Sequence, residues 1–194
     1  VTKAEEALPP LVLERFCKLL SPEDYATTLR SFCLEKPLTF RTNTLLSTEE
    51  QVLDEIKGNG MESKPIAWCP LGHRLTIGTI RSLQSLPTSD SGGLYIQAAS
   101  SMLAVHAMRV TADMRVLDLC AAPGSKTSQL AAVMGNSGML VANDRSRKRL
   151  YRLREVLQSQ GVTNVEIMCG PGERLGQSHA DCFDRVLVDA PCSG

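Results

Sequence analysis

The chain has 194 residues, of which 43% are hydrophobic and 22% charged, a composition typical of a globular protein with a buried core. Its 21 basic and 21 acidic residues give a net charge of zero, so any contact with a nucleic acid has to come from local patches. Seven cysteines without a C-x-x-C pair and only three histidines argue against a zinc site. Neither a signal peptide nor a membrane-length apolar run is recognisable, so we expect an intracellular protein with free thiols.

The N-terminal part of the chain predicts helices followed by a small α+β module. Apolar residues at helical spacing predict a helix over Leu11–Leu20, and Ser21 followed by Pro22 and two acids predicts the start of a second helix that ends near Cys33. An extended run over Leu38–Thr44 predicts a strand. The remaining predicted elements of the module are a helix over Ser47–Lys57, short strands around Pro65–Cys69 and Arg74–Ile77, and a loop over Leu86–Gly93.

Helices and strands alternate over the rest of the chain. The predicted helices are Ile96–Arg109, Lys126–Met134 and Ser146–Gln160. The predicted strands are Met114–Leu119, Met139–Asn143, Val165–Met168 and Val186–Val188. This alternation is typical of βαβ units with a parallel sheet and right-handed crossovers. We therefore expect N-terminal helices over 1–36, a small α+β module over 37–93 with Phe40 and Trp68 packed inside it, and an α/β domain over 94–194.

Two motifs follow strands of the predicted parallel sheet. After Met114–Leu119 comes a turn of small residues that runs into a helix, where free backbone N–H groups are available and the backbone can approach a ligand closely. The second motif, from Asp189 to Gly194, reads D-A-P-C-S-G and follows the last strand. Ligands of open α/β sheets bind at the carboxyl ends of the strands, so both motifs predict an enzyme site there.

The motifs resemble those of the Nol/Nop/Sun (RsmB/RsmF) family of RNA cytosine-5 methyltransferases. Asp118–Thr127 is similar to the cofactor loop of the family, and Asp189–Gly194 is similar to its second signature. Gly93–Met102 and Phe40–Leu45 resemble two further family segments, so that the resemblance covers roughly Pro37–Gly194. It implies a Rossmann-like methyltransferase domain with an incomplete, mostly parallel sheet in the order 3-2-1-4. It also implies S-adenosylmethionine as the cofactor, and the missing G-x-G-x-x-G spacing argues against a dinucleotide.

The resemblance predicts which residues hold the cofactor. We expect it to lie across the loop formed by Cys120, Ala121, Ala122, Pro123, Gly124, Ser125 and Lys126, with Asp189 near its methionine end. Lys126 is a cation at a helix start, which the helix dipole disfavours, so we expect a partner such as Asp189 or an anionic ligand.

Two further cofactor residues are expected on the second strand–helix pair. Asp144 comes twenty positions after Gly124, a spacing suited to a ribose diol, although it could instead be the N-cap of the following helix. Arg149 matches an arginine that helps to fix the cofactor in the family. The alternative is a solvated basic helix face, and for the surrounding cluster such a face competes with an RNA contact: Arg145, Arg147, Lys148, Arg152 and Arg154.

Methylation of carbon 5 of cytosine needs transient covalent attack on carbon 6, for which a thiolate is suited. The family places its attacking cysteine in a later T-C motif, so the resemblance implies an auxiliary role for Cys192 in resolving the adduct. It also places the nucleophile beyond Gly194 and implies that these 194 residues alone are inactive. An inert core thiol is the alternative for Cys192.

Pro171 departs from the family pattern, which usually has an acid for the adenine amino group at this place. Glu173 could substitute for that acid only if the loop shifted. The expected function is formation of 5-methylcytosine in rRNA or tRNA, without a metal or membrane partner. The alternative is a catalytically silent homologue that binds RNA or a protein, and an oxidoreductase is disfavoured by the glycine pattern.

Overall fold

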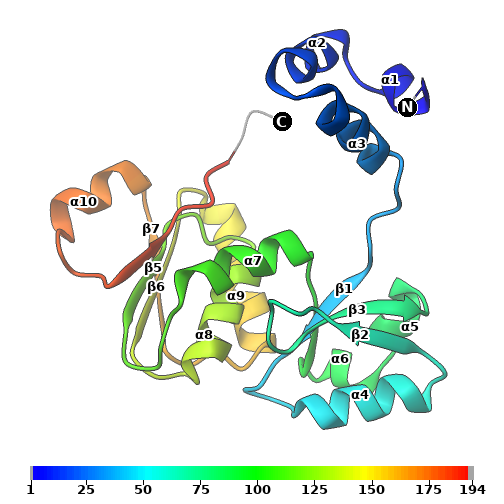
Figure 1. The fold of residues 1–194 in the computed structure, drawn as a ribbon. Helices are drawn as coiled ribbons and strands as arrows, with labels where there is room; N and C mark the ends of the chain where they lie inside the picture. Colours follow the sequence, from blue (N-terminus) through cyan, green and yellow to red (C-terminus); the bar gives the residue numbers. More distant parts are fainter. Residues whose placement is uncertain (1, 192–194) are drawn as a thin grey trace. The chain divides into compact units, whose positions relative to one another are not determined.

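The computed structural model describes residues 2–191, with side chains from residue 5 onward, and divides the chain into two compact units, Val1–Pro37 and Leu38–Gly194 (Figure 1). The first unit holds three helices: α1 (Thr2–Ala7), α2 (Pro10–Leu19) and α3 (Pro22–Phe32). The hydroxyl of Ser21 accepts a hydrogen bond from the backbone N–H of Asp24 at 3.2 Å, which is the predicted N-cap of α3. Helix α1 was not predicted, because its six residues carry no apolar periodicity.

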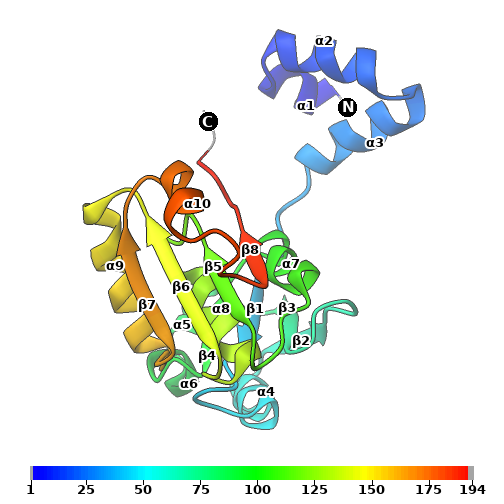
Figure 2. The same ribbon diagram turned by 90° about the vertical axis from the view of Figure 1, so that its left-hand side faces the viewer.

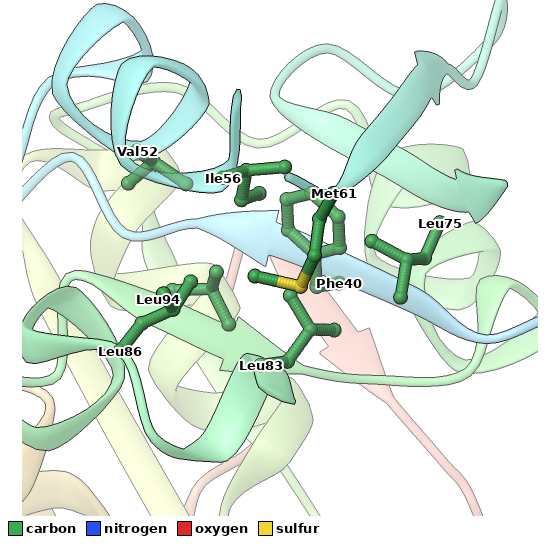
Figure 3. Close-up of a cluster of buried hydrophobic side chains, with 8 residues drawn as sticks. All are labelled: Phe40, Val52, Ile56, Met61, Leu75, Leu83, Leu86 and Leu94. Carbon is green, nitrogen blue, oxygen red and sulfur yellow. The ribbon is translucent and has the colours of Figure 1, made fainter. Parts of the chain in front are cut away.

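The second unit begins with an antiparallel sheet in the order β2-β3-β1-β4. Its strands are β1 (Thr39–Thr42), β2 (Glu62–Pro65), β3 (Gly72–Ile77) and β4 (Leu94–Ile96), and its helices are α4 (Glu49–Gly58), α5 (Ile80–Gln84) and α6 (Pro87–Asp90). Phe40 is fully buried in a core of aliphatic side chains and Met61 that comes from both the sheet and the helices (Figure 3). Burial of this apolar surface is the main stabilisation of the module.

Several expectations for this module are wrong. Trp68 does not pack in the core, because its side chain is 38% exposed and its ring lies 6.0 Å from that of His106. Strand β2 ends where a strand was expected to begin. Strand β4 was not predicted, and its last residue, Ile96, was expected to begin a helix. Helix α6 occupies the expected loop, since Pro87 supplies the fixed φ of a first helical residue.

The second sheet is parallel, with the order β7-β6-β5-β8, which confirms the predicted order 3-2-1-4. Its strands are β5 (Arg115–Asp118), β6 (Met139–Asp144), β7 (Val165–Cys169) and β8 (Arg185–Leu187). One face is covered by α7 (Ala99–Met108), α8 (Ser125–Met134) and α9 (Arg147–Ser159) (Figures 1 and 2). The opposite face carries the β7–β8 connection with η1 (Gly172–Arg174) and α10 (Leu175–Ser178).

Buried polar side chains join the two sheets of the second unit. Arg41 on β1 donates from Nη2 to the hydroxyl of Ser128 on α8 at 2.8 Å, and Gln97 donates to Gln129 at 2.8 Å. Asn43 donates to the backbone carbonyl of Gln160 at 2.9 Å. The antiparallel module is therefore held against the helices that follow β5 and β6. Among residues 2–191, no helix is long and apolar enough to cross a membrane.

Candidate functional site

The loop between β5 and α8 is built from small residues because α9 packs against it. Ala121 and Ala122 are buried in one cluster with Leu150 and Leu153 of α9. Gly124 has a φ of 111°, and a Cβ there would lie 3.0 Å from a methyl group of Leu153. Small residues are therefore required on the side of the loop that faces α9. The expectation that they also let a ligand approach the backbone stays a prediction.

Asp144, at the end of β6, is buried and holds the adjacent loops. Its Oδ2 accepts the backbone N–H of Ala122 at 3.2 Å, and its Oδ1 accepts the backbone N–H of Ser146 at 2.9 Å. The alternative that Asp144 is the N-cap of α9 is wrong, since that position is Ser146, whose hydroxyl accepts from the backbone of Arg149 at 3.4 Å. Oδ1 has accepted one hydrogen bond and keeps a second lone pair for a ligand hydroxyl.

Arg149 is tied to the same loop. Its Nη1 lies 3.2 Å from Oδ2 of Asp144, and its Nη2 donates to the backbone carbonyl of Ala122. The guanidinium is half exposed, so one side remains open to a ligand. Its contacts with the Asp144 carboxylate and the Ala122 carbonyl distinguish Arg149 from the other basic residues around it, of which Arg152 pairs with Glu155 at 3.0 Å on the surface.

Lys126 and Asp189 come from the two motifs and form an ion pair. Lys126 Nζ lies 2.5 Å from Oδ2 of Asp189, with the lysine largely buried and the aspartate more exposed. Of the two partners expected for Lys126, the structure shows Asp189. The pair joins the start of α8 to the segment after β8, at the carboxyl edge of the sheet.

Two buried polar residues at the strand ends were not predicted as site residues. Asp118 is 1% exposed, and its Oδ2 accepts the hydroxyl of Thr127 at 2.7 Å. Burial raises the pKa of this carboxyl from its usual 3.8 to about 6, against the opposing effects of the Thr127 hydrogen bond and the charge of Lys126. Asn143 donates to the carbonyls of Leu119 at 3.0 Å and Gly170 at 3.1 Å. Both residues could have been noticed in the sequence, because each is a polar residue at the end of a predicted buried strand. Polar side chains are seldom fully buried in a protein.

The strand-end cavity has a volume of about 440 Å³ and opens at the carboxyl ends of β5, β6 and β8. It is lined by eleven residues: Leu119, Cys120, Asn143, Asp144, Arg145, Arg149, Gly172, Glu173, Val188, Ala190 and Pro191. Three predicted cofactor residues are among them, namely Cys120, Asp144 and Arg149. The others, from Ala121 to Lys126 and Asp189, do not line it.

The structure also shows the surroundings of Pro171, which replaces the acid that the family usually has for the adenine amino group. Pro171 precedes the 3-10 helix η1, and this short helix brings Glu173 to the cavity wall. Glu173 thus lies in the cavity wall without a shift of the loop, and its substitution for the family acid stays a prediction. Its carboxylate belongs to the same lining as Asp144.

The strand-end cavity has the chemistry that an adenosine-bearing, positively charged cofactor requires. Oδ1 of Asn143 is buried and finds no hydrogen-bond partner within residues 5–191, so the wall has an acceptor to offer. Two carboxylates, Asp144 and Glu173, suit hydroxyl, amino and sulfonium groups. The pKa of the Cys120 thiol is raised by burial and by the carboxylates of Asp144 and Asp118, which keeps it a neutral wall residue.

Cys192 lies outside the described residues, and its predicted auxiliary role stays a prediction. Groups of three or more His, Cys, Asp or Glu side chains that could hold a metal ion are not found among the side chains of residues 5–191.

Comparison with protein families gives a match to 16S rRNA methyltransferase RsmB/F over residues 105–194. Ribosomal RNA small subunit methyltransferase F of Erwinia tasmaniensis is 38% identical over 191 residues, covering 96% of this chain and 40% of that protein. The same-named protein of Aeromonas salmonicida is 39% identical over 186 residues, covering 90% of this chain and 37% of that protein. The chain thus spans about two fifths of the length of these relatives.

Solved structures show the same fold. A methyltransferase homolog protein from Pyrococcus horikoshii is 31% identical, with a TM-score of 0.78 over 96% of this chain and 65% of that one. NSun6 from Pyrococcus horikoshii, solved with SFG, has a TM-score of 0.83 at 18% identity, over 95% of this chain and 71% of that one. The Rossmann-like methyltransferase fold is confirmed. Residues 105–194 match the RsmB/F methyltransferase family, as the motifs of the chain predict.

Proposed function

We propose that the protein is an S-adenosylmethionine-dependent methyltransferase that forms 5-methylcytosine in ribosomal RNA. The observation that carries this proposal is the strand-end cavity, which collects Asp144, Asn143, Arg149 and Glu173 at the carboxyl edge of a Rossmann-like sheet. The names of the matched relatives support ribosomal RNA as the substrate and, with it, an intracellular protein.

Different residues of the cavity bind different groups of the cofactor. Oδ1 of Asp144 accepts a ribose hydroxyl, while Arg149 holds Asp144 and the carbonyl of Ala122 in place. Glu173 and the unpartnered Oδ1 of Asn143 provide acceptors for the adenine amino group. When bound, S-adenosylmethionine supplies an electrophilic methyl group on a sulfonium.

Lys126 and Asp189 complete the site at the carboxyl edge of the sheet. Their ion pair fixes the D-A-P segment against α8, which positions the start of the segment that leads to Cys192. In the proposed reaction, a cysteine of the full protein outside these 194 residues adds to carbon 6 of cytosine. Carbon 5 is then methylated, and loss of its proton accompanies breakage of the bond between carbon 6 and the attacking sulfur, which leaves as a thiolate. Cys192 assists this last step.

The alternative is a catalytically silent homologue that binds RNA or a protein, and the replacement of the family acid by Pro171 is one argument for it. Glu173 in the cavity wall supplies a nearby acid and favours the active enzyme.

The test is methyl transfer from labelled S-adenosylmethionine to 16S rRNA by the full-length protein, followed by nucleoside analysis. The proposal expects label in 5-methylcytidine, and accumulation of a covalent RNA–protein adduct when Cys192 is replaced by serine. Label in another nucleoside would overturn the cytosine assignment. Binding of rRNA without any transfer would favour the silent homologue.

A further inference from the structure

A second cavity, here called the Arg41 cavity, lies between the antiparallel module and the helices α7 and α8. Its volume is about 420 Å³, close to that of the strand-end cavity, and the two share no lining residue. Its walls come from β1, the segment between β2 and β3, the end of α7 and the second half of α8. A cavity of this size accommodates a small organic molecule.

Arg41 gives this cavity a buried positive charge. The residue is 3% exposed, and its guanidinium lies over the ring of Tyr95 at 4.8 Å. Nε donates to the side-chain oxygen of Gln97 at 2.8 Å, and Nη2 donates to the hydroxyl of Ser128 at 2.8 Å. All these partners are neutral. Burial lowers the pKa of Arg41 to about 10, so that the guanidinium still carries its charge at neutral pH.

Two polar atoms of the cavity-lining residues remain unsatisfied. Nη1 of Arg41 and the hydroxyl oxygen of Thr42 are both buried, and neither has a hydrogen-bond partner within the described part of the chain. A buried charged donor without a partner costs free energy, which a ligand that accepts its hydrogen bond would recover. Arg41 and Thr42 are neighbours on β1, so their side chains point to opposite faces of the strand, and Nη1 of Arg41 is the charged donor for an acceptor on the ligand.

The rest of the lining determines what else the ligand must be. Acidic side chains are missing from the lining that the structure describes, and an exposed arginine, Arg109, adds positive charge. The remaining wall is mainly apolar, with Leu71, Val105 and Val133 among its residues. The charge favours an anion, and the walls favour an apolar body attached to it.

We propose that the Arg41 cavity is a second ligand site, which binds a small monocarboxylate whose apolar body lies between β1 and α8. The Arg41 cavity shares no lining residue with the strand-end cavity, so this proposal stands or falls independently of the proposed cofactor site.

The test is a calorimetric titration of the protein with hexanoate, with 1-hexanol and inorganic phosphate as comparison probes. We expect saturable binding of hexanoate and binding of hexanol weaker by about tenfold or more, because the alcohol lacks the charge that Arg41 requires. Equal affinities for hexanoate and hexanol, or no binding of hexanoate, would overturn the proposal. Tighter binding of phosphate than of hexanoate would overturn the assignment of a carboxylate.

Variants locate the site. Ala132→Phe fills the cavity without changing Arg41 and should abolish hexanoate binding, whereas Arg109→Gln should weaken it several-fold. Arg81→Gln, at an exposed arginine of α5 that does not line the cavity, is the matched control and should bind as the wild type does. Thermal unfolding verifies that each variant is folded. Unchanged hexanoate affinity in a folded Ala132→Phe protein would contradict the site.

Discussion

Arg149 reaches back from α9 to lie 3.2 Å from the carboxylate of Asp144, while the same guanidinium donates to the carbonyl of Ala122. Asp144 in turn accepts the backbone N–H of Ala122. One residue of the β5–α8 loop is thus bound through both its N–H and its C=O by a single ion pair. The ion pair between Arg149 and Asp144 therefore fixes the conformation of the β5–α8 loop and also places two charged groups in the wall of the strand-end cavity.

Replacement of Asp144 by alanine should weaken S-adenosylmethionine binding by roughly 1–3 kcal/mol, because it removes a ligand acceptor and leaves buried donors unpaired. Calorimetric titration measures the change, and thermal unfolding verifies that the variant is folded. Glu155→Ala, at an exposed acid of α9, is the control and should bind normally. Unchanged affinity in Asp144→Ala would remove Asp144 from the site.

The buried Asp118 should make stability depend on pH. Its pKa is raised from 3.8 to about 6 in the folded protein, so the folded state holds its proton more tightly than the unfolded state does. Its contribution is therefore fully present below pH 4 and is lost as the pH rises through 6, at a cost on the order of 2–3 kcal/mol.

Asp118→Asn removes this titration while keeping an acceptor for Thr127. Relative to the wild type, the free energy of unfolding of the variant should rise between pH 4 and pH 6 in denaturant titrations. A difference between the two proteins that stays constant over this range would show that Asp118 titrates normally.

Gly124 should tolerate no side chain. Gly124→Ala places a Cβ 3.0 Å from Leu153 at a φ of 111°, and should lower the free energy of unfolding by about 1–3 kcal/mol. Gly170→Ala is the matched control, in the loop after β7, where an added Cβ meets no atom within 4 Å. Urea denaturation compares the two, and equal stabilities would contradict the packing of α9 against the loop.

The basic residues beside the cavity should contribute to RNA affinity. Arg145→Glu with Arg152→Glu should weaken rRNA binding by the full-length protein and reduce the salt slope of the binding constant by about one for each phosphate that is no longer neutralised. Filter binding at several salt concentrations measures both. If affinity and slope are unaltered, the exposed face of α9 is only a solvated surface.

The sequence predicted the features that depend on local patterns. Alternating strands and helices predicted a parallel sheet, and the family resemblance of the motifs implied its strand order. The cation at the start of α8 indicated a partner that the structure identifies as Asp189. Features that depend on distant packing were not predictable. The neighbour of Gly124 is a helix more than 25 residues away in sequence, and the exposure of Trp68 follows from its place outside the apolar cluster of the module.

Asn143 shows the same limit within the site. Its sequence position suggested only the end of a strand, whereas its amide ties two loops through Leu119 and Gly170 and leaves an acceptor in the cavity. Three of the predicted cofactor residues line the cavity: Cys120 follows β5, Asp144 ends β6, and Arg149 lies in the first turn of α9. The small residues between them are covered by α9, which no spacing in the loop itself could reveal.

The most direct test of the account is a titration of S-adenosylmethionine into the isotopically labelled protein, followed by backbone and side-chain amide resonances. The account predicts saturable shifts at Cys120, Glu173 and the side-chain amide of Asn143, with Val133 in the Arg41 cavity unaffected. Saturable shifts confined to the Arg41 cavity, or no saturable shift at all, would contradict the assignment of the strand-end cavity as the cofactor site.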